Sequence, residues 1–338
     1  MTVDTADHET RDAPSATELS APFPWFGGKQ WVAPQVWRAF GRVQNYVEPF
    51  FGSGAVLLAR PRPTWATPDD PGTETVNDKG RFLANFWRAL KADPEAVAAW
   101  CDYPVNETDL HARHRWLLAQ LPRVSELLDA DPDAFDAKVA GWWVWGACAW
   151  IGTGWCDETR ERRDGRTPEQ LPHLGNRGRG VHAKGRRSNL AAYLTELSAR
   201  LRGVRVACGD WTRVTGDSVT WRHGLTAVFL DPPYSDGNQQ YAAGGTGTNL
   251  SADVRAWALS AGKRKDMRVI LAGYDGEHND LETQGWHVIA WKARGGYASQ
   301  GDGENVNAAR ERLWLSPHCL HAETQRQRSI FDVIGGTP

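Results

Sequence analysis

Residues 45–60 read NYVEPFFGSGAVLLAR, and this stretch predicts a short strand, a glycine-rich turn and a helix in that order. The turn is Phe51-Gly52-Ser53-Gly54. Glycines between a strand and a helix let a ligand approach the backbone closely, and the N-terminus of the helix favours electronegative groups there. The spacing is not GxGxxG and no Walker lysine–serine pair follows, so a nucleoside triphosphate site is not indicated. A simple turn without a ligand is the alternative.

The pattern around this stretch predicts a sheet that is built from both ends of the chain. A second strand is expected at 74–78 and a second helix at 81–91. Residues 94–121 and 132–150 then predict helices with no strand between them. A further helix from about Asn189 precedes strands that we expect at 204–208, 226–230, 268–272, 286–291 and 311–315. This arrangement indicates a doubly wound, mostly parallel α/β sheet that is interrupted by a helical insert.

The composition is that of a globular chain with polar ends. Residues 1–20 are polar and acidic and lack a secretory signal, so we expect a disordered tail there and a second loosely held tail over 321–338. No apolar run is long enough to span a membrane. The five cysteines are odd in number and form no CxxC pair, which argues against a disulfide framework or a zinc cluster and favours a reducing cytoplasm.

Positive charge and tryptophan are concentrated locally. The formal net charge is -2, so a nucleic-acid binder of this balance must gather its positive charge in one place. The segment 177–187 does so, because it holds no acid and interleaves glycines with the cations Arg177, Arg179, Lys184, Arg186 and Arg187. Such a loop suits contacts to phosphates, and a solvated surface loop is the alternative. Five of the 18 tryptophans fall within 142–155, which predicts buried packing, with base stacking by one of them as the alternative.

The tetrapeptide Asp231-Pro232-Pro233-Tyr234 directly follows the apolar strand that is predicted at 226–230. Ligands of open α/β sheets bind beyond the carboxyl ends of the strands, so the motif is placed for chemistry. An aromatic amine is a poor nucleophile because its lone pair is delocalised into the ring. Asp231 and the Pro232 carbonyl could each accept a hydrogen bond from the amine, so that its nitrogen becomes more tetrahedral. The two prolines hold that carbonyl in a fixed direction, and Tyr234 offers a face for a flipped base. A strand-terminating turn is the alternative.

Three weaker motifs are of interest for a bound cofactor. Pro24-Trp25-Phe26-Gly27-Gly28-Lys29 combines aromatic rings, a flexible turn and a cation that could serve a zwitterionic amino-acid moiety. Asp78 ends the second predicted strand, where a carboxylate can accept hydrogen bonds from ribose hydroxyls. Asp210 could accept from an adenine amine while Trp211 packs on its ring. Each of these residues could instead belong to an ordinary turn.

In combination these motifs resemble the alpha group of adenine-specific DNA methyltransferases, the Dam-like family. The family's order is a W-x-G-G-K start, an E-P-F-x-G-S-G segment, a target-recognition insert and then D-P-P-Y. This sequence presents Trp25 to Lys29, Glu48 to Gly54, an insert, and Asp231 to Tyr234. The resemblance covers residues 22–316, with gaps in the insert, and it is concentrated in the three motifs.

The resemblance implies a Rossmann-like methyltransferase sheet formed by residues 21–94 and 191–320, with a DNA-binding target-recognition insert over 95–190. It also implies S-adenosyl-L-methionine as the cofactor and double-stranded DNA as the partner. The residues implied to hold the cofactor are Trp25, Lys29, Glu48, Phe50, Gly52, Ser53, Gly54, Asp78, Asp210 and Trp211.

On the same resemblance, the target base would be handled by Asp231, Pro232, Pro233 and Tyr234. Residues 271–275 would pack beside the target pocket, although Gly273 and Tyr274 depart from the polar Ser-Asn pair that is often seen there. No metal, no covalent intermediate and no obligate protein partner are expected. The family is common in bacteria and their phages, which implies a bacterial cytoplasm and a role in restriction-modification or in protection from it.

Several alternatives to adenine N6 methylation stay open. Cytosine N4 methylation uses the same amine chemistry, and Asp231 favours adenine because the cytosine enzymes more often have serine before the two prolines. The sequence contains no Pro-Cys dipeptide, which argues against cytosine C5 chemistry, since that reaction needs a thiol nucleophile. A catalytically silent DNA-binding relative and an RNA-modifying enzyme are the remaining alternatives.

Overall fold

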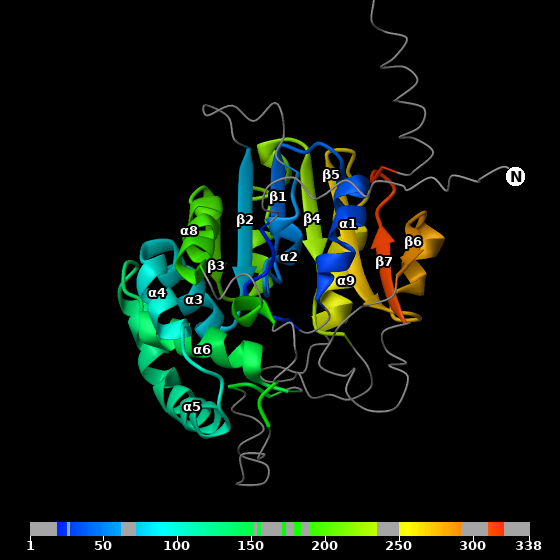
Figure 1. Ribbon diagram of the computed structural model, residues 1–338. Coiled ribbons are helices and arrows are strands. Elements are labelled where there is room, and N and C mark those ends of the chain that lie inside the picture. The colour runs from blue at the N-terminus through cyan, green and yellow to red at the C-terminus, as the bar shows by residue number, and fades with distance from the viewer. Residues whose placement is uncertain are drawn as a thin grey trace, which may run out of the picture.

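The protein is built around a seven-stranded sheet with the order β3-β2-β1-β4-β5-β7-β6. The computed structural model describes residues 19–25, 28–61, 72–151, 154–156, 171–173, 179–183, 189–234, 250–291 and 310–320. The strands are β1 (Asn45–Glu48), β2 (Thr73–Asp78), β3 (Val204–Cys208), β4 (Thr226–Leu230), β5 (Met267–Tyr274), β6 (His287–Ala290) and β7 (Glu311–Leu315). β7 runs antiparallel to its neighbours β5 and β6, and its arrowhead points opposite to that of β2 in Figure 1.

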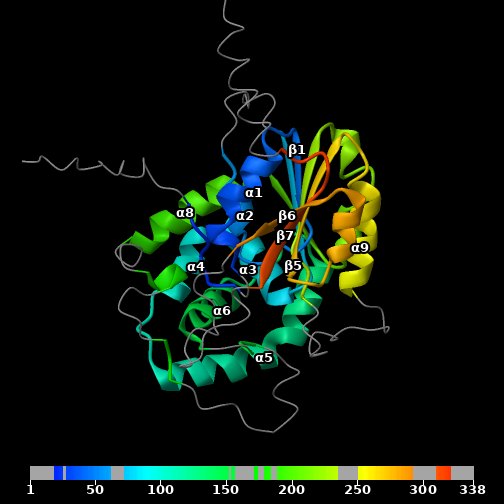
Figure 2. The ribbon, with the colours of Figure 1, turned by 90° about the vertical axis from the view of Figure 1, so that its right-hand side faces the viewer.

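Helices cover both faces of this sheet. One face carries α1 (Ala33–Phe40), α2 (Ala55–Leu58), α3 (Arg81–Ala92) and α8 (Leu190–Leu201), whereas α9 (Leu250–Ala261) covers the other face, as Figure 2 shows. Both faces of β4 are therefore buried: Ala227 and Phe229 belong to the core on the first side, and Val228 and Leu230 to the core under α9. The doubly wound α/β sheet that the sequence predicts is confirmed. α1 and α9 were not expected from the sequence.

The insert between β2 and β3 contains α4 (Pro94–Cys101), α5 (Glu107–Ala130) and α6 (Ala137–Ala149). The prediction of one helix over 94–121 is wrong, because α4 ends before Pro104 and a new helix begins after Asn106. The Asn106 side chain accepts a hydrogen bond from the Asp109 amide at 2.7 Å, which is a typical N-cap. α5 also continues past Pro122, where the buried Val124 and Leu128 anchor its second half in the core.

The insert shares its core with the sheet-covering helices. The Phe23 ring lies 5.5 Å from that of Phe86 in α3 and 5.1 Å from that of Trp143 in α6. α5 and α6 lie beyond the carboxyl ends of the parallel strands, toward the bottom of Figures 1 and 2. The domain boundaries at 95 and 190 stay a prediction. The expected tails at 1–20 and 321–338 lie outside the described residues, apart from residues 19 and 20.

None of the described helices is both long and apolar enough to cross a membrane. α6 is apolar but short. Trp143 and Trp145 within it, and Trp150 directly after it, are buried in the core. This agrees with the predicted packing role of the tryptophan-rich segment.

The packing of α4 on α6 depends on the absence of a side chain at Gly141. A Cβ atom there would lie 2.3 Å from the Trp100 Cβ and 2.9 Å from the Val97 carbonyl oxygen. We expect Gly141→Ala to lower the free energy of unfolding by about 1–3 kcal/mol, because the two helices must separate to admit the methyl group. Urea unfolding measures this change. Gly203→Ala is the matched control, since nothing lies within 4 Å of its added Cβ. Equal midpoints for the two variants would contradict the close helix contact.

Candidate active site

The predicted site residues come from several elements that meet at one edge of the sheet. β1 lies between β2 and β4 and runs parallel to both, with Val47 in register with Thr75 and Val228. The carboxyl ends of these strands therefore lie side by side. Glu48 ends β1, Asp78 ends β2 and Asp231 follows β4.

The glycine-rich turn after β1 is held by the end of β2. The Phe51 amide donates to the Asn77 carbonyl at 2.9 Å, and the Gly52 amide donates to Asp78 Oδ2 at 2.9 Å. The other oxygen of Asp78 accepts the Gly80 amide at 2.9 Å. Gly52 has φ +47° and Gly54 φ +72°, conformations that favour glycine. Burial raises the pKa of Asp78, although these amide hydrogen bonds oppose the shift.

Aromatic side chains border this turn on two sides. The Trp25 indole packs so closely on Gly52 that an added Cβ would lie 2.4 Å from its Nε1. The rings of Phe50 and Trp211 are stacked, with centroids 6.3 Å apart. Asp210, directly before Trp211, is exposed, and its Oδ1 accepts the Thr212 amide at 3.0 Å. Ser53 is buried within the turn.

Lys29 links the N-terminal motif to the tetrapeptide after β4. It begins the short helix η1 (Lys29–Trp31), is buried, and places its Nζ 2.9 Å from Asp231 Oδ1. The sequence resemblance implied that Lys29 would hold the cofactor, whereas the observed contact is with the carboxylate of the tetrapeptide. Its ammonium also lies 5.2 Å from the centroid of the Tyr234 ring. The ion pair therefore fixes the orientation of the Asp231 carboxylate.

Tyr234 faces a second carboxylate that the sequence reasoning missed. Its hydroxyl lies 3.1 Å from Asp231 Oδ1 and 3.0 Å from Oε2 of Glu311, the buried first residue of β7. Its ring makes an edge contact with Tyr274 at 4.7 Å, which brings the end of β5 to the tetrapeptide. Burial raises the pKa of Glu311 to about 7; Lys29 opposes this shift and Asp231 adds to it. The available signal was an acid at the start of the apolar run ERLWL.

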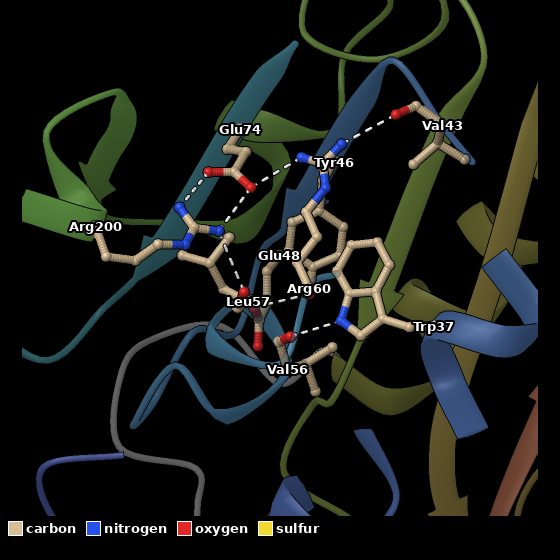
Figure 3. A network of polar contacts seen from close by, with 9 residues as sticks. All are labelled: Trp37, Val43, Tyr46, Glu48, Val56, Leu57, Arg60, Glu74 and Arg200. Atoms are coloured by element: carbon tan, nitrogen blue, oxygen red, sulfur yellow. Dashed lines mark hydrogen bonds and ion pairs between the residues drawn. The ribbon is translucent and has the colours of Figure 1, made fainter. Parts of the chain in front are cut away.

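Glu48 is buried at the centre of the site. It accepts a hydrogen bond from the Tyr46 hydroxyl at 2.8 Å, as Figure 3 shows. Burial raises the pKa of Glu48 well above its ordinary value, and the nearby charges of Asp231 and Asp78 add to the shift. A cofactor-binding role for Glu48 stays a prediction. Among the described residues, no cluster of His, Cys, Asp and Glu could hold a metal ion.

Residues 25–115 match the family model of the D12 class N6 adenine-specific DNA methyltransferases. D12 class methyltransferases are enzymes, so the expected family and the expectation of an enzyme are confirmed over this segment. The match includes the glycine-rich turn, Lys29 and Asp78, and the sheet is that of a Rossmann-like methyltransferase. The tetrapeptide at 231–234 lies beyond the matched segment. A search of curated proteins found no match to the chain.

The basic segment proposed to contact DNA falls mostly outside the described residues. Arg177, Lys184, Arg186 and Arg187 lie outside them. Arg179 is described and half-buried, and its carbonyl accepts the His182 amide at 2.8 Å. The role of these cations in DNA binding stays a prediction.

A largely buried charge network connects β2 of the matched segment to α8, as Figure 3 shows. Glu74 of β2 accepts two hydrogen bonds from Arg200 of α8, at 2.7 and 2.8 Å, and one from Arg60 at 2.8 Å. Arg60 also donates to the Val43 carbonyl just before β1. Burial alone would raise the pKa of Glu74, but the hydrogen bonds and charges of Arg200 and Arg60 outweigh it and lower that pKa.

We expect Glu74→Gln to lower the free energy of unfolding by about 3–5 kcal/mol at neutral pH, because two largely buried guanidinium groups lose their counter-charge. Since the pKa of Glu74 is lowered in the folded state, the stabilisation is complete at neutral pH and is lost as the pH falls through that pKa. The difference from wild type should therefore shrink in acid, which urea unfolding at a series of pH values measures.

Asp129→Asn is the control for this prediction, because it removes the exposed partner of Arg81. That change should cost less than about 1 kcal/mol. A Glu74→Gln cost that matched the control, or that did not vary with pH, would contradict a stabilising buried network.

Proposed function

We propose that this protein transfers a methyl group from S-adenosyl-L-methionine to adenine N6 in double-stranded DNA, with the target base flipped out of the helix. The observation that carries the proposal is the position of Asp231. Its carboxylate follows β4, beside the glycine-rich turn that follows the adjacent strand β1, and Lys29 and Tyr234 hold the same oxygen atom. D12 class relatives act on adenine N6, which supports the same chemistry here.

The residues around the turn fit the proposed cofactor. The Trp25 indole packs directly on Gly52, with no room for a Cβ between them. The backbone of the turn and an aromatic ring could therefore contact the same ligand. Asn77 Oδ1 is buried without a hydrogen-bond partner. Asp78 would hold the ribose and Asp210 and Trp211 the adenine ring, whereas Trp25 would contact the methionine part. When bound, the cofactor supplies an electrophilic methyl group.

In the proposed mechanism, the chain positions and polarises the amine of the flipped base. The two N–H groups of the amine donate hydrogen bonds to Asp231 and to the Pro232 carbonyl, and these bonds localise the nitrogen lone pair. The 2.9 Å ion pair with Lys29 fixes the orientation of the Asp231 carboxylate. Pro232 is buried, so the carbonyl is held by a rigid and packed backbone. Positioning and electrostatic alignment supply most of the rate enhancement.

The helical insert 95–190 and the basic segment 177–187 would contact DNA and select the sequence around the target. We place the protein in the cytoplasm of a bacterium or of a phage-infected cell, with a role in restriction-modification or in protection from it. Cytosine N4 methylation and a catalytically silent DNA-binding protein are the alternatives, and nucleoside mass spectrometry of treated DNA distinguishes all three.

We expect Asp231→Asn to lower methyl transfer at least about 100-fold, since the amide cannot accept and hold the amine hydrogens as a carboxylate does. Tritiated cofactor and unmodified DNA measure the rate, and the product should be N6-methyladenine. Cofactor binding should stay within about threefold of wild type. The exposed Asp217→Asn is the matched control. Activity of Asp231→Asn equal to that of the control would overturn the assignment.

We expect Gly52→Ala to lower the affinity for S-adenosyl-L-methionine at least about tenfold, because its methyl group displaces Trp25 from the turn. Calorimetric titration measures the affinity. Gly276→Ala is the matched control: Gly276 also has a left-handed backbone, with φ +89°, but nothing lies within 4 Å of its added Cβ. Equal affinities of the two variants would show that the cofactor does not bind at this turn.

A further inference from the structure

One hydroxyl group separates two carboxylates in the site. The Tyr234 oxygen lies 3.1 Å from Asp231 Oδ1 and 3.0 Å from Glu311 Oε2, both within hydrogen-bond distance. A phenol carries one proton and donates it to one acceptor at a time. The row of three oxygens therefore has two hydrogen-bond positions and one proton when both carboxyl groups are ionised. A second proton on Glu311 would fill both positions, because Glu311 would donate to Tyr234 and Tyr234 to Asp231.

The surroundings of Glu311 favour a group that changes its protonation near neutral pH. Glu311 is buried, and the basic and acidic side chains that face it come from three other elements: Lys29 of η1, Asp231 after β4 and Glu277 after β5. On its own strand, Arg312 donates to the Glu311 carbonyl rather than to its carboxylate, and the neighbouring Arg310 lies over the Tyr274 ring. Around Glu311, one cation, Lys29, is therefore opposed by two further acids, Asp231 and Glu277. Burial is the largest cause that raises the pKa of Glu311 to about 7.

We propose that Glu311 is the final acceptor of the proton that the methylated amine releases, and that Tyr234 relays this proton from Asp231. This inference rests on the proposed function, and it assigns a role to a residue outside the tetrapeptide. Glu311 acts through Tyr234 and does not touch the base, so it is a positioning residue for the proton and not a catalytic residue.

The proposed steps balance in atoms and charge. The lone pair of the amine forms the new nitrogen–carbon bond, the carbon–sulfur bond breaks, and its electron pair stays on sulfur. The nitrogen, now positive, loses a proton to Asp231 Oδ1. Asp231 passes this proton to the Tyr234 oxygen while the phenol's own proton moves to Glu311 Oε2. At the end the amine is neutral, Asp231 is again a carboxylate, and Glu311 is a neutral acid.

The relay predicts a specific pH dependence. Glu311 must be ionised to accept a proton, so the single-turnover rate of wild type should rise with pH and level off above about 7. Below that value it should fall up to about tenfold for each pH unit. In Glu311→Gln the amide can still hydrogen-bond to Tyr234 but cannot take the proton. We therefore expect this variant to be at least about tenfold slower than wild type at high pH and to lose the step near pH 7.

Single-turnover methylation of DNA with tritiated S-adenosyl-L-methionine, from about pH 5.5 to 9, measures this profile. The exposed Glu282→Gln is the matched control and should keep the wild-type rate and the pH step. A Glu311→Gln variant that keeps the wild-type step would overturn the relay, because a purely structural hydrogen bond survives the exchange.

A second readout does not depend on turnover. Infrared difference spectra of the protein without cofactor should contain a protonated-carboxyl band that titrates near pH 7 in wild type and Glu282→Gln and is missing in Glu311→Gln. The absence of this band in wild type would overturn the relay. If the band is present but wild type forms no N6-methyladenine, the proposed function fails; if N6-methyladenine forms and the step survives in Glu311→Gln, only the relay fails.

Discussion

The ion pair between Lys29 and Asp231 is the contact on which the geometry of the site depends. It joins a residue from the beginning of the described chain to one that follows the helical insert, across a separation of 2.9 Å. Both side chains are largely withdrawn from water, so loss of either partner would leave a costly unpaired charge in the interior. The parallel pairing of the adjacent strands β1 and β4 brings the tetrapeptide to the same edge of the sheet as the glycine-rich turn, and the ion pair connects the N-terminal motif to it.

Three further carboxyl groups, those of Glu48, Asp78 and Glu311, lie around this pair, and each of the four has different surroundings. Glu48 is buried next to a tyrosine hydroxyl, and burial raises its pKa well above the ordinary value, whereas Asp78 accepts hydrogen bonds from two backbone amides. Asp231 has a lysine partner, and Glu311 shares a tyrosine with it. Such a separation of roles among acids is typical of active sites, where neighbouring groups must bind, orient and exchange protons without equal charges.

Much of the sheet could be predicted from the sequence, since buried parallel strands are short apolar runs between turns. β3, β4 and β7 begin and end where the sequence predicts. The break between α4 and α5 was missed because the apolar spacing continues across it and only the local backbone effects of Pro104 and Asn106 interrupt it. The residues of the tetrapeptide and the turn could be named from their motifs. Glu311 could not, because its position depends on β7 running antiparallel, which brings the first residue of that strand to the edge where β4 and β5 end.

The shared core of the insert and the sheet-covering helices also has an evolutionary meaning. Phe23, Phe86 and Trp143 come from three separate segments and touch one another in the interior. An exchange of the whole insert between related proteins would leave the first two rings without their partner, so this insert is not a transferable cassette. Changes in surface loops leave this core intact, so the shared packing constrains which parts of the insert can diverge.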